Sequence, residues 1–164
     1  MIGDWRRSFR LPFALALLSA CITSPTWADI QMGLDAYHRG DYTTALSEWR
    51  RLAEQWEAEE AQFNVGLLYE NGRGVTQDYV QARQWYTKAA AQGYAAAQCN
   101  LGRLYEFGQG GPQDYVQAYM WYLLGAAHGD KLGAELRDAL AKRMTPAQLF
   151  QAQERAREWK QQFK

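Results

Sequence analysis

The chain has 164 residues with 18 basic and 18 acidic side chains, and 48% of its residues are hydrophobic. This length suffices for one domain with a modest core. A formal net charge of zero at pH 7 argues against a surface that binds nucleic acid, because such a surface needs an excess of positive charge.

The first element is an export signal, which we place at residues 1–28. Three arginines precede an apolar run over 11–20, which is too short for a comfortable transmembrane helix, and small residues and a proline follow it. Small side chains three residues and one residue before the cut favour cleavage after Ala28. This cleavage predicts a periplasmic or secreted product with 15 basic and 17 acidic residues.

A second processing route stays open, because the residues from Leu18 to Cys21 resemble a bacterial lipobox. The signal would then cover residues 1–20, and Cys21 would anchor the product as an outer-membrane lipoprotein. We favour cleavage after Ala28, since this site falls just before the repeats begin. Only Cys99 then remains, so no intramolecular disulfide can form, and its place on an inner helix predicts a buried thiol.

The central part of the chain repeats itself after 36 residues. The segment 61–93 aligns without a gap onto 97–129 and matches it at 20 of 33 positions. Apolar residues recur at spacings of three and four on either side of a glycine-rich break, which predicts two amphipathic helices joined by a turn in each copy. A shorter, degenerate copy precedes them over 29–60, as expected at the end of a repeat array.

Local signals within the copies agree with this interpretation. A glycine that closes the first helix and an aspartate that caps the second are expected at Gly72 and Asp78, and again at Gly108 and Asp114. Glycine inside a helix costs about 1 kcal/mol relative to alanine, so Gly66 predicts a close contact with a small residue such as Ala82. Gly102 and Ala118 repeat this arrangement. In the degenerate copy, Tyr37 matches Tyr69, and Trp49 matches Trp85 with a displacement of one residue.

After the repeats, residues 131–164 are expected to form a cap. The segment 131–143 has the pattern of a helix, and Thr145 and Gln148 are spaced as the two partners of a helix-start box. A last helix follows, up to about Gln162. We expect both helices to cover the exposed end of the repeat stack.

The two strong copies resemble the Sel1-like repeat family. In the first copy the matching positions are Ala61, Gly66, Tyr69, Gly72, Gly74, Val75, Asp78, Tyr79, Ala82, Trp85, Tyr86, Lys88, Ala89, Ala90 and Gly93. The second copy departs from the family pattern at Gly111, Pro112 and Leu124. The resemblance implies an exported bacterial protein with an all-α fold, a short right-handed α-solenoid of TPR-like helical hairpins with a C-terminal helical cap. Its repeats would cover 29–60, 61–96 and 97–130.

No catalytic or metal-binding pattern accompanies the repeats. His38 and His128 lie 90 residues apart, and the sequence has no nucleophile with its base, no pair of metal ligands and no phosphate loop. We therefore expect no enzyme, no cofactor and no metal. Some cysteine-rich Sel1-like proteins are described as penicillin-binding or β-lactamase-like, but this chain lacks their cysteine framework and a serine-lysine motif.

Variation between the copies selects a candidate binding surface. Positions that hold the fold are repeated, whereas Leu67 becomes Arg103 and Asn71 becomes Phe107. On helical spacing, one groove of the first helices is formed by Asn64, Leu67, Asn71, Asn100, Arg103 and Phe107. Ordinary surface variation is an alternative explanation of these differences.

The leading prediction is a non-enzymatic, monomeric scaffold or adaptor of the bacterial cell envelope that binds a protein or peptide in this groove. An envelope protein associated with peptidoglycan or another glycan is the alternative. A regulator of a periplasmic signalling receptor is a third possibility, which only the family resemblance suggests. Neither nucleic acid nor a membrane span in the mature chain is expected.

Overall fold

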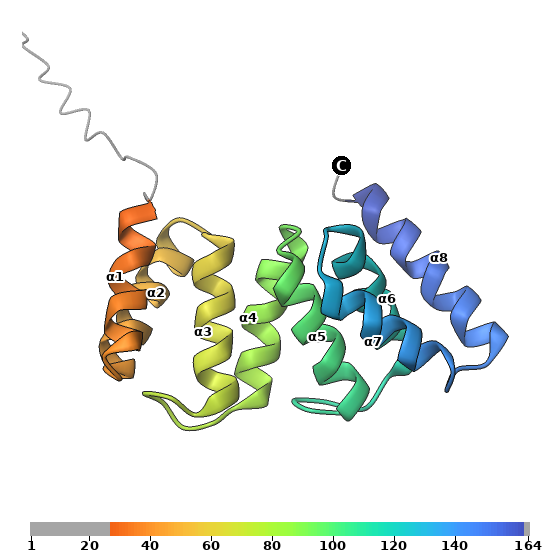
Figure 1. Cartoon of the computed structure of the whole chain (residues 1–164), viewed down its shortest axis with the longest axis horizontal. Helices are drawn as coiled ribbons and strands as arrows, with labels where there is room; N and C mark the ends of the chain where they lie inside the picture. The colour runs from red at the N-terminus through yellow and green to blue at the C-terminus, as the bar shows by residue number, and fades with distance from the viewer. Residues whose placement is uncertain (1–26, 163–164) are drawn as a thin grey trace, which may run out of the picture.

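A computed structural model of the chain describes residues 27–162, and every regular element in this range is a helix (Figure 1). The helices are α1 (Trp27–His38), α2 (Tyr42–Gln55), α3 (Glu59–Asn71), α4 (Tyr79–Ala91), α5 (Ala95–Phe107), α6 (Tyr115–Ala127), α7 (Lys131–Ala141) and α8 (Pro146–Gln162). The predictions for residues 1–26, including the signal sequence and Cys21, lie outside the described residues. None of the described helices is long and apolar enough to cross a membrane.

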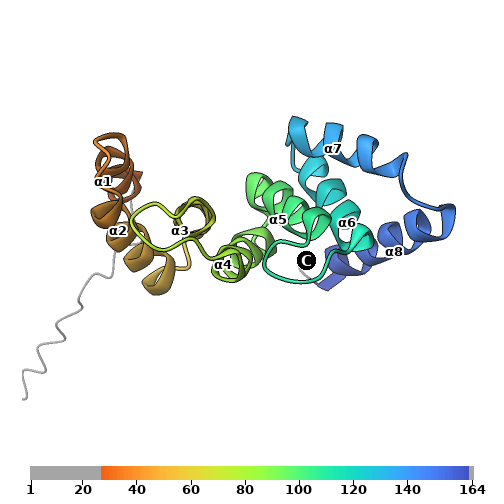
Figure 2. The same cartoon turned by 90° about the horizontal axis from the view of Figure 1, so that it is seen from below.

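Consecutive helices pair into hairpins, and each hairpin packs on the next. The pairs are α1 with α2, α3 with α4, and α5 with α6. In the view from below, α1, α3, α5 and α7 lie along one side of the molecule and α2, α4 and α6 along the other (Figure 2). This arrangement is the short helical solenoid that the sequence predicts.

The ends of the helices lie where the local signals place them. Gly72 and Gly108 end α3 and α5 with φ angles of 64° and 67°. The Asp78 carboxylate accepts hydrogen bonds from two backbone amides in the first turn of α4, and Asp114 accepts one in α6. These bonds satisfy amides that a helix leaves without an internal partner. The hairpin turn therefore follows from local chemistry.

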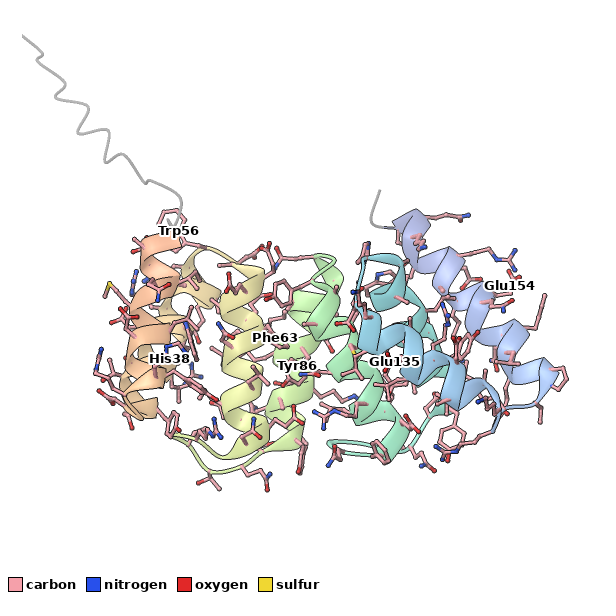
Figure 3. All side chains as sticks on the ribbon, viewed as in Figure 1. His38, Trp56, Phe63, Tyr86, Glu135 and Glu154 are labelled. Atoms are coloured by element: carbon pink, nitrogen blue, oxygen red, sulfur yellow. The ribbon has the colours of Figure 1, made fainter. Side chains whose placement is uncertain are left out.

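Tyrosine rings of the second helices pack on glycines of the first helices. A Cβ atom at Gly66 would lie 2.7 Å from two ring carbons of Tyr86, and a Cβ atom at Gly102 would meet the ring of Tyr122 in the same way. Both tyrosines are fully buried, and Figure 3 shows Tyr86 in the middle of the molecule. The closest neighbour of Gly66 is therefore the ring of Tyr86 and not the predicted Ala82. At Gly102 the backbone oxygen of the predicted Ala118 also lies close, 3.1 Å from such a Cβ atom, although the ring of Tyr122 is closer.

The loop inside each strong hairpin presses on the preceding second helix. Gly74 has a φ of 69°, and a Cβ atom there would lie 2.6 Å from the backbone carbonyl of Tyr42, at the start of α2. Gly110 has a φ of 71°, and a Cβ atom there would lie 2.6 Å from the carbonyl carbon of Tyr79, at the start of α4. Only glycine fits these positions, so the backbones of successive repeats touch directly.

The first hairpin fits the same plan with different residues. A Cβ atom at Gly33 would overlap the indole of Trp49, so these two residues stand where Gly66 and Tyr86 stand in the next hairpin. Trp49 therefore corresponds to Tyr86. The match of Trp49 to Trp85 that the sequence suggested is wrong. Trp49 appears displaced by one residue because it fills the position of the ring that packs on the glycine, and not the position of Trp85.

The two last helices end the solenoid in different ways. Helix α7 continues the row of first helices beside α5 and α6, whereas α8 packs mainly on α6. Thr145 and Gln148 form the expected helix-start box, in which each side chain accepts a hydrogen bond from the backbone amide of the other, at 3.3 and 2.9 Å. The rings of Trp121 in α6 and Trp159 in α8 meet edge to face with centroids 4.8 Å apart. Helix α8 therefore covers the second-helix side of the last repeat.

Candidate functional site

A buried carboxylate lies between the second and third hairpins. Glu70, near the C-terminal end of α3, is 7% exposed. The hydroxyl of Tyr86 donates to Glu70 Oε2 at 2.6 Å, and Arg103 of α5 forms an ion pair with the other carboxylate oxygen. Asn100 Nδ2 in turn donates to the Tyr86 hydroxyl oxygen at 3.2 Å. Side chains of two successive repeats therefore converge on one carboxylate.

The same arrangement recurs one repeat later. Glu106 of α5 is buried and accepts a hydrogen bond from the hydroxyl of Tyr122 at 2.8 Å. Its other oxygen lies 2.5 Å from Nη1 of Arg143, which follows α7. The guanidinium of Arg143 also stacks on the ring of Tyr115, at 4.8 Å from its centroid. Arg143 of the cap thus pairs with Glu106 as Arg103 of α5 pairs with Glu70 at the preceding junction.

The environment of these carboxylates keeps the tyrosines protonated. Burial, followed by the negative charge of Glu70 and the hydrogen bond to it, raises the pKa of Tyr86 far above its ordinary value. Burial and the hydrogen bond to Glu106 raise the pKa of Tyr122 in the same way. A phenol held in this form donates a hydrogen bond and does not act as a base near neutral pH. We therefore interpret the network as a structural link between repeats.

The first hairpin uses a phenol where the later ones use a carboxylate. Tyr37 lies four residues after Gly33, as Glu70 lies four residues after Gly66, so the predicted match of Tyr37 to Tyr69 is wrong by one residue. Its hydroxyl accepts a hydrogen bond from Arg73 of the next hairpin, whose guanidinium lies 5.4 Å from the Tyr37 ring centroid. An arginine of the following unit therefore anchors each of these junctions.

Three of the six predicted binding residues lie towards the surface of the first helices. Phe107, the last residue of α5, is 62% exposed. Asn71 ends α3 in the equivalent place, is exposed, and donates from Nδ2 to the backbone oxygen of Leu67 at 2.8 Å. Leu67 itself is half-buried and packs against the core. The structure thus places Asn71 and Phe107 at matching ends of neighbouring first helices.

The other three lie at the junctions between repeats. Arg103 keeps 38% of its side chain exposed, and Asn100 is half-buried in the Tyr86 network. Asn64 is 8% exposed, and its Nδ2 has no hydrogen-bond partner among the described residues. Its counterpart Asn100 donates to Tyr86 of the preceding repeat, whereas the residue that stands in the place of Tyr86 one hairpin earlier is Trp49, whose indole has no acceptor oxygen. Their role in binding stays a prediction.

Other reactive groups have ordinary structural surroundings. The Cys99 thiol is buried, as the sequence predicts, and burial raises its pKa to about 12, which disfavours the reactive thiolate. His128 Nδ1 lies 2.8 Å from Gln98 Oε1, and Gln98 Nε2 donates to the backbone oxygen of Ala90. This geometry requires the histidine proton on Nδ1. Within residues 27–162, no cluster of three potential metal ligands is found.

Comparison with known proteins identifies the repeated unit. A family model described as the Sel1 repeat matches residues 59–94 and 95–130. The chain carries two Sel1 repeats. Each begins at the first residue of a first helix, Glu59 of α3 or Ala95 of α5, which is two residues before the boundary placed from the sequence. This unit generally mediates protein–protein interaction, and Sel1 repeat proteins are typically non-enzymatic scaffolds.

Solved structures with related repeats share the fold. A protective antigen present in uropathogenic Escherichia coli strains, which displays an SLR fold, is 32% identical and superposes with a TM-score of 0.78 over 83% of this chain. A Sel1 repeat protein from Oxalobacter formigenes is 36% identical, with a TM-score of 0.60 over 65% of this chain. The chain covers 30% of the first protein and 45% of the second. The Sel1 assignment thus rests on structure as well as sequence.

Curated relatives match over a shorter stretch. Protein sel-1 homolog 2 from Homo sapiens is 38% identical over 84 residues, and its counterpart from Mus musculus is 32% identical over the same length. The match takes in 48% of this chain and only 12% of either relative. The chain therefore spans only a small part of the length of these larger proteins.

The buried glutamates Glu70 and Glu106 were not among the predicted site residues. Glu70 and Glu106 occupy the same position in the two Sel1 repeats, each directly after a tyrosine of the first helix. An acidic residue that is identical in both copies and lies on the inner side of an amphipathic helix is the signal for such a link. Arg103 was selected because it differs between the copies, and its ion pair with Glu70 gives it a structural task as well.

Proposed function

We propose that this chain is a non-enzymatic scaffold of the bacterial cell envelope that binds a protein or peptide along α3 and α5. Phe107 carries the proposal, because it is a large apolar side chain, 62% exposed, at a position where the other repeat has Asn71. Isolated exposed apolar residues are common, so its neighbours matter.

Arg103 lies four residues before Phe107 and therefore on the same side of α5. Aromatic residues and arginine dominate the binding energy of many protein interfaces. The ion pair with Glu70 holds the Arg103 side chain in place before a partner arrives, which lowers the entropy lost on binding. The surface therefore suits a segment that offers an apolar side chain to Phe107 and a hydrogen-bond acceptor to the guanidinium.

Photo-crosslinkers incorporated in cells at Asn71 and Phe107 test this surface. The matched control is Phe150 of α8, which is 63% exposed and lies outside the two repeats. We expect the first two sites to capture the same protein and the Phe150 site not to capture it. With that protein purified, Phe107→Ala should weaken binding about tenfold and Phe150→Ala less than twofold. Equal effects of both substitutions would exclude this surface.

A glycan-associated role gives a different result. The scaffold should stay in solution when purified peptidoglycan is sedimented, whereas co-sedimentation would favour binding to the cell wall. A nitrocefin assay on the purified chain should show no hydrolysis.

Export is the second part of the proposal, with a periplasmic or secreted monomer as the product. Its support is the pattern of residues 1–28, in which three arginines precede a short apolar run. Fractionation of cells should recover a chain that begins at Asp29. Palmitate labelling that Cys21→Ser abolishes would instead establish a lipoprotein.

A further inference from the structure

Two surface pockets lie at equivalent places in successive repeats. One, which we call the open pocket, measures about 460 Å³ and is lined by Glu54, Glu57, Gln62, Lys88 and Gln92, together with two alanines. The other, which we call the α8 pocket, measures about 290 Å³, and its polar and large side chains are those of Gln92, Gln98, Leu124, His128, Trp159 and Lys160. Both lie at the opposite edge of the solenoid from Asn71 and Phe107.

The floors of the two pockets are built alike. Gln62 of α3 binds Gln92 at the end of α4, with 2.9 Å between Oε1 and Nε2. Thirty-six residues later, Gln98 of α5 binds His128 at the end of α6, with 2.8 Å between Oε1 and Nδ1. Lys88 in the open pocket corresponds to Leu124 in the α8 pocket. The repeat therefore produces one kind of pocket twice.

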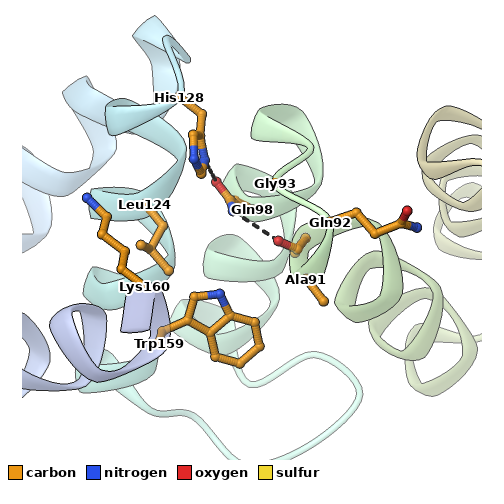
Figure 4. A pocket seen from close by; sticks show the side chains of 9 residues that line it. Ala91, Gln92, Gly93, Gln98, Leu124, His128, Trp159 and Lys160 are labelled. Carbon is orange, nitrogen blue, oxygen red and sulfur yellow. Dashed lines mark hydrogen bonds between the residues drawn. The ribbon is translucent and has the colours of Figure 1, made fainter. Parts of the chain in front are cut away.

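The α8 pocket shows what such a pocket can hold. Trp159 and Lys160, near the end of α8, face residues of α4 and α6 across it (Figure 4). Trp159 packs edge to face on Trp121, with ring centroids 4.8 Å apart. Helix α8 thus acts as an intramolecular ligand that presents an aromatic side chain followed by a basic one.

Beside the open pocket, Trp85 stands where Trp121 stands in the next repeat, and Lys88 of the pocket lining covers its ring. Lys88 Nζ lies 4.1 Å from the centroid of the Trp85 ring, and its side chain is exposed. All residues that line this pocket belong to the two hairpins that form it, and its volume is larger than that of the α8 pocket. An exposed lysine can leave an aromatic ring at small cost, so another aromatic group can take its place.

The charge of the open pocket indicates the kind of group that fits. Its lining contains Glu54 and Glu57, whereas the lining of the α8 pocket contains no acidic residue. Glu54 pairs with Arg50 at 2.9 Å, which leaves Glu57 as the carboxylate best placed for an incoming cation. Glu57 has a φ of 51°, an unfavourable value for a residue with a side chain, and Gln92 Nε2 donates to its backbone oxygen at 2.7 Å.

We propose that the open pocket docks an amphipathic helix of another protein that presents an aromatic residue followed by a lysine or arginine, as α8 does in the neighbouring pocket. The aromatic side chain displaces Lys88 and packs towards Trp85, and the basic side chain pairs with Glu57. This interaction is independent of the surface around Phe107.

A peptide with the sequence of residues 146–162, labelled with fluorescein, is the probe, and its fluorescence anisotropy is followed as the full chain is added. We expect Lys88→Leu, which copies Leu124 into the open pocket, to strengthen binding about threefold to tenfold. Glu57→Lys should weaken it about tenfold, and so should Trp159→Ala in the peptide. Glu135→Lys on α7 is the matched charge reversal and should change the affinity less than twofold.

Two results would overturn the proposal. One is no binding of the peptide to either the unaltered chain or Lys88→Leu. The other is exchange of the peptide with the chain's own α8, in which case Glu57→Lys has no effect and Trp159→Ala in the chain strengthens binding. Circular dichroism melting curves of each variant show whether a change in affinity reflects a change in folding.

Discussion

Removing the hydroxyl of Tyr86 tests whether the buried glutamate network holds the repeats together. The substitution Tyr86→Phe keeps the ring that packs on Gly66 and deletes the hydrogen bond to Glu70 Oε2, which is 2.6 Å long and buried. A hydrogen bond to a charged acceptor contributes about 1.5–3 kcal/mol. The amide of Asn100 also loses its acceptor. We expect a loss of about 2 kcal/mol in the free energy of unfolding, which corresponds to a fall of about 6–10 °C in Tm for a domain of this size.

Thermal and urea unfolding followed by circular dichroism measure this loss. Tyr79→Phe is the control, because the Tyr79 hydroxyl only accepts an exposed hydrogen bond from Gln77 at 3.1 Å, and it should change stability by less than about 0.5 kcal/mol. A double-mutant cycle with Glu70→Gln should show a coupling of about 1 kcal/mol or more. If Tyr86→Phe melts within 2 °C of the unaltered chain, the network does not link the repeats.

Four further results are expected. Above about pH 10 the unfolded chain ionises tyrosines that the folded chain keeps protonated. The contribution of these tyrosines to the free energy of unfolding is therefore constant below that pH and falls as the pH rises above it. We expect the fall to be less steep in Tyr86→Phe. Gly110→Ala should cost at least about 2 kcal/mol in urea unfolding, and Gly129→Ala about 1 kcal/mol, because both have positive φ but only the first meets a neighbouring backbone. Cys99 should react with a thiol reagent at least about 100-fold faster in urea than in the folded chain. Deleting residues 145–164 should lower Tm and promote aggregation, since it uncovers α6; an unchanged melting curve would contradict the role of α8 as a cap.

Local chemistry explains why so much of the fold is predictable from the sequence. The positive φ of Gly72 and the capping bonds of Asp78 depend on residues within a few positions, and so does the helix-start box of Thr145 and Gln148. The repeat then predicts the hairpin twice. These features need no knowledge of distant contacts.

Features that depend on packing between elements were predicted less well. The partner of Gly66 is a ring and not a methyl group, since spacing along a helix does not tell how large its neighbour is. Trp49 was assigned to the wrong position because it was matched to Trp85 by residue type, although it lies eight residues after Asp41, as Tyr86 lies eight residues after Asp78. The preference of α8 for α6 over α7 is a tertiary contact with no local signal.

For the binding surface, variation between the copies is informative but incomplete. It selects Asn71 and Phe107, which are exposed, whereas Asn64, which is almost fully buried and matches Asn100 in the other copy, was included on helical spacing. It also passes over Glu70, because a residue that is identical in both copies is assigned to the scaffold. Whether the six selected residues bind a partner stays a prediction.

The contacts of Gly74 and Gly110 with the preceding helix have a consequence for how such a chain can evolve. Because these contacts join glycine to backbone atoms, the spacing between neighbouring units does not depend on which side chains the units carry. A duplicated unit of 36 residues therefore contains the loop glycine that packs on the preceding unit, and the array can lengthen by duplication. Each new copy can then exchange its exposed side chains without altering the geometry on which its neighbours depend.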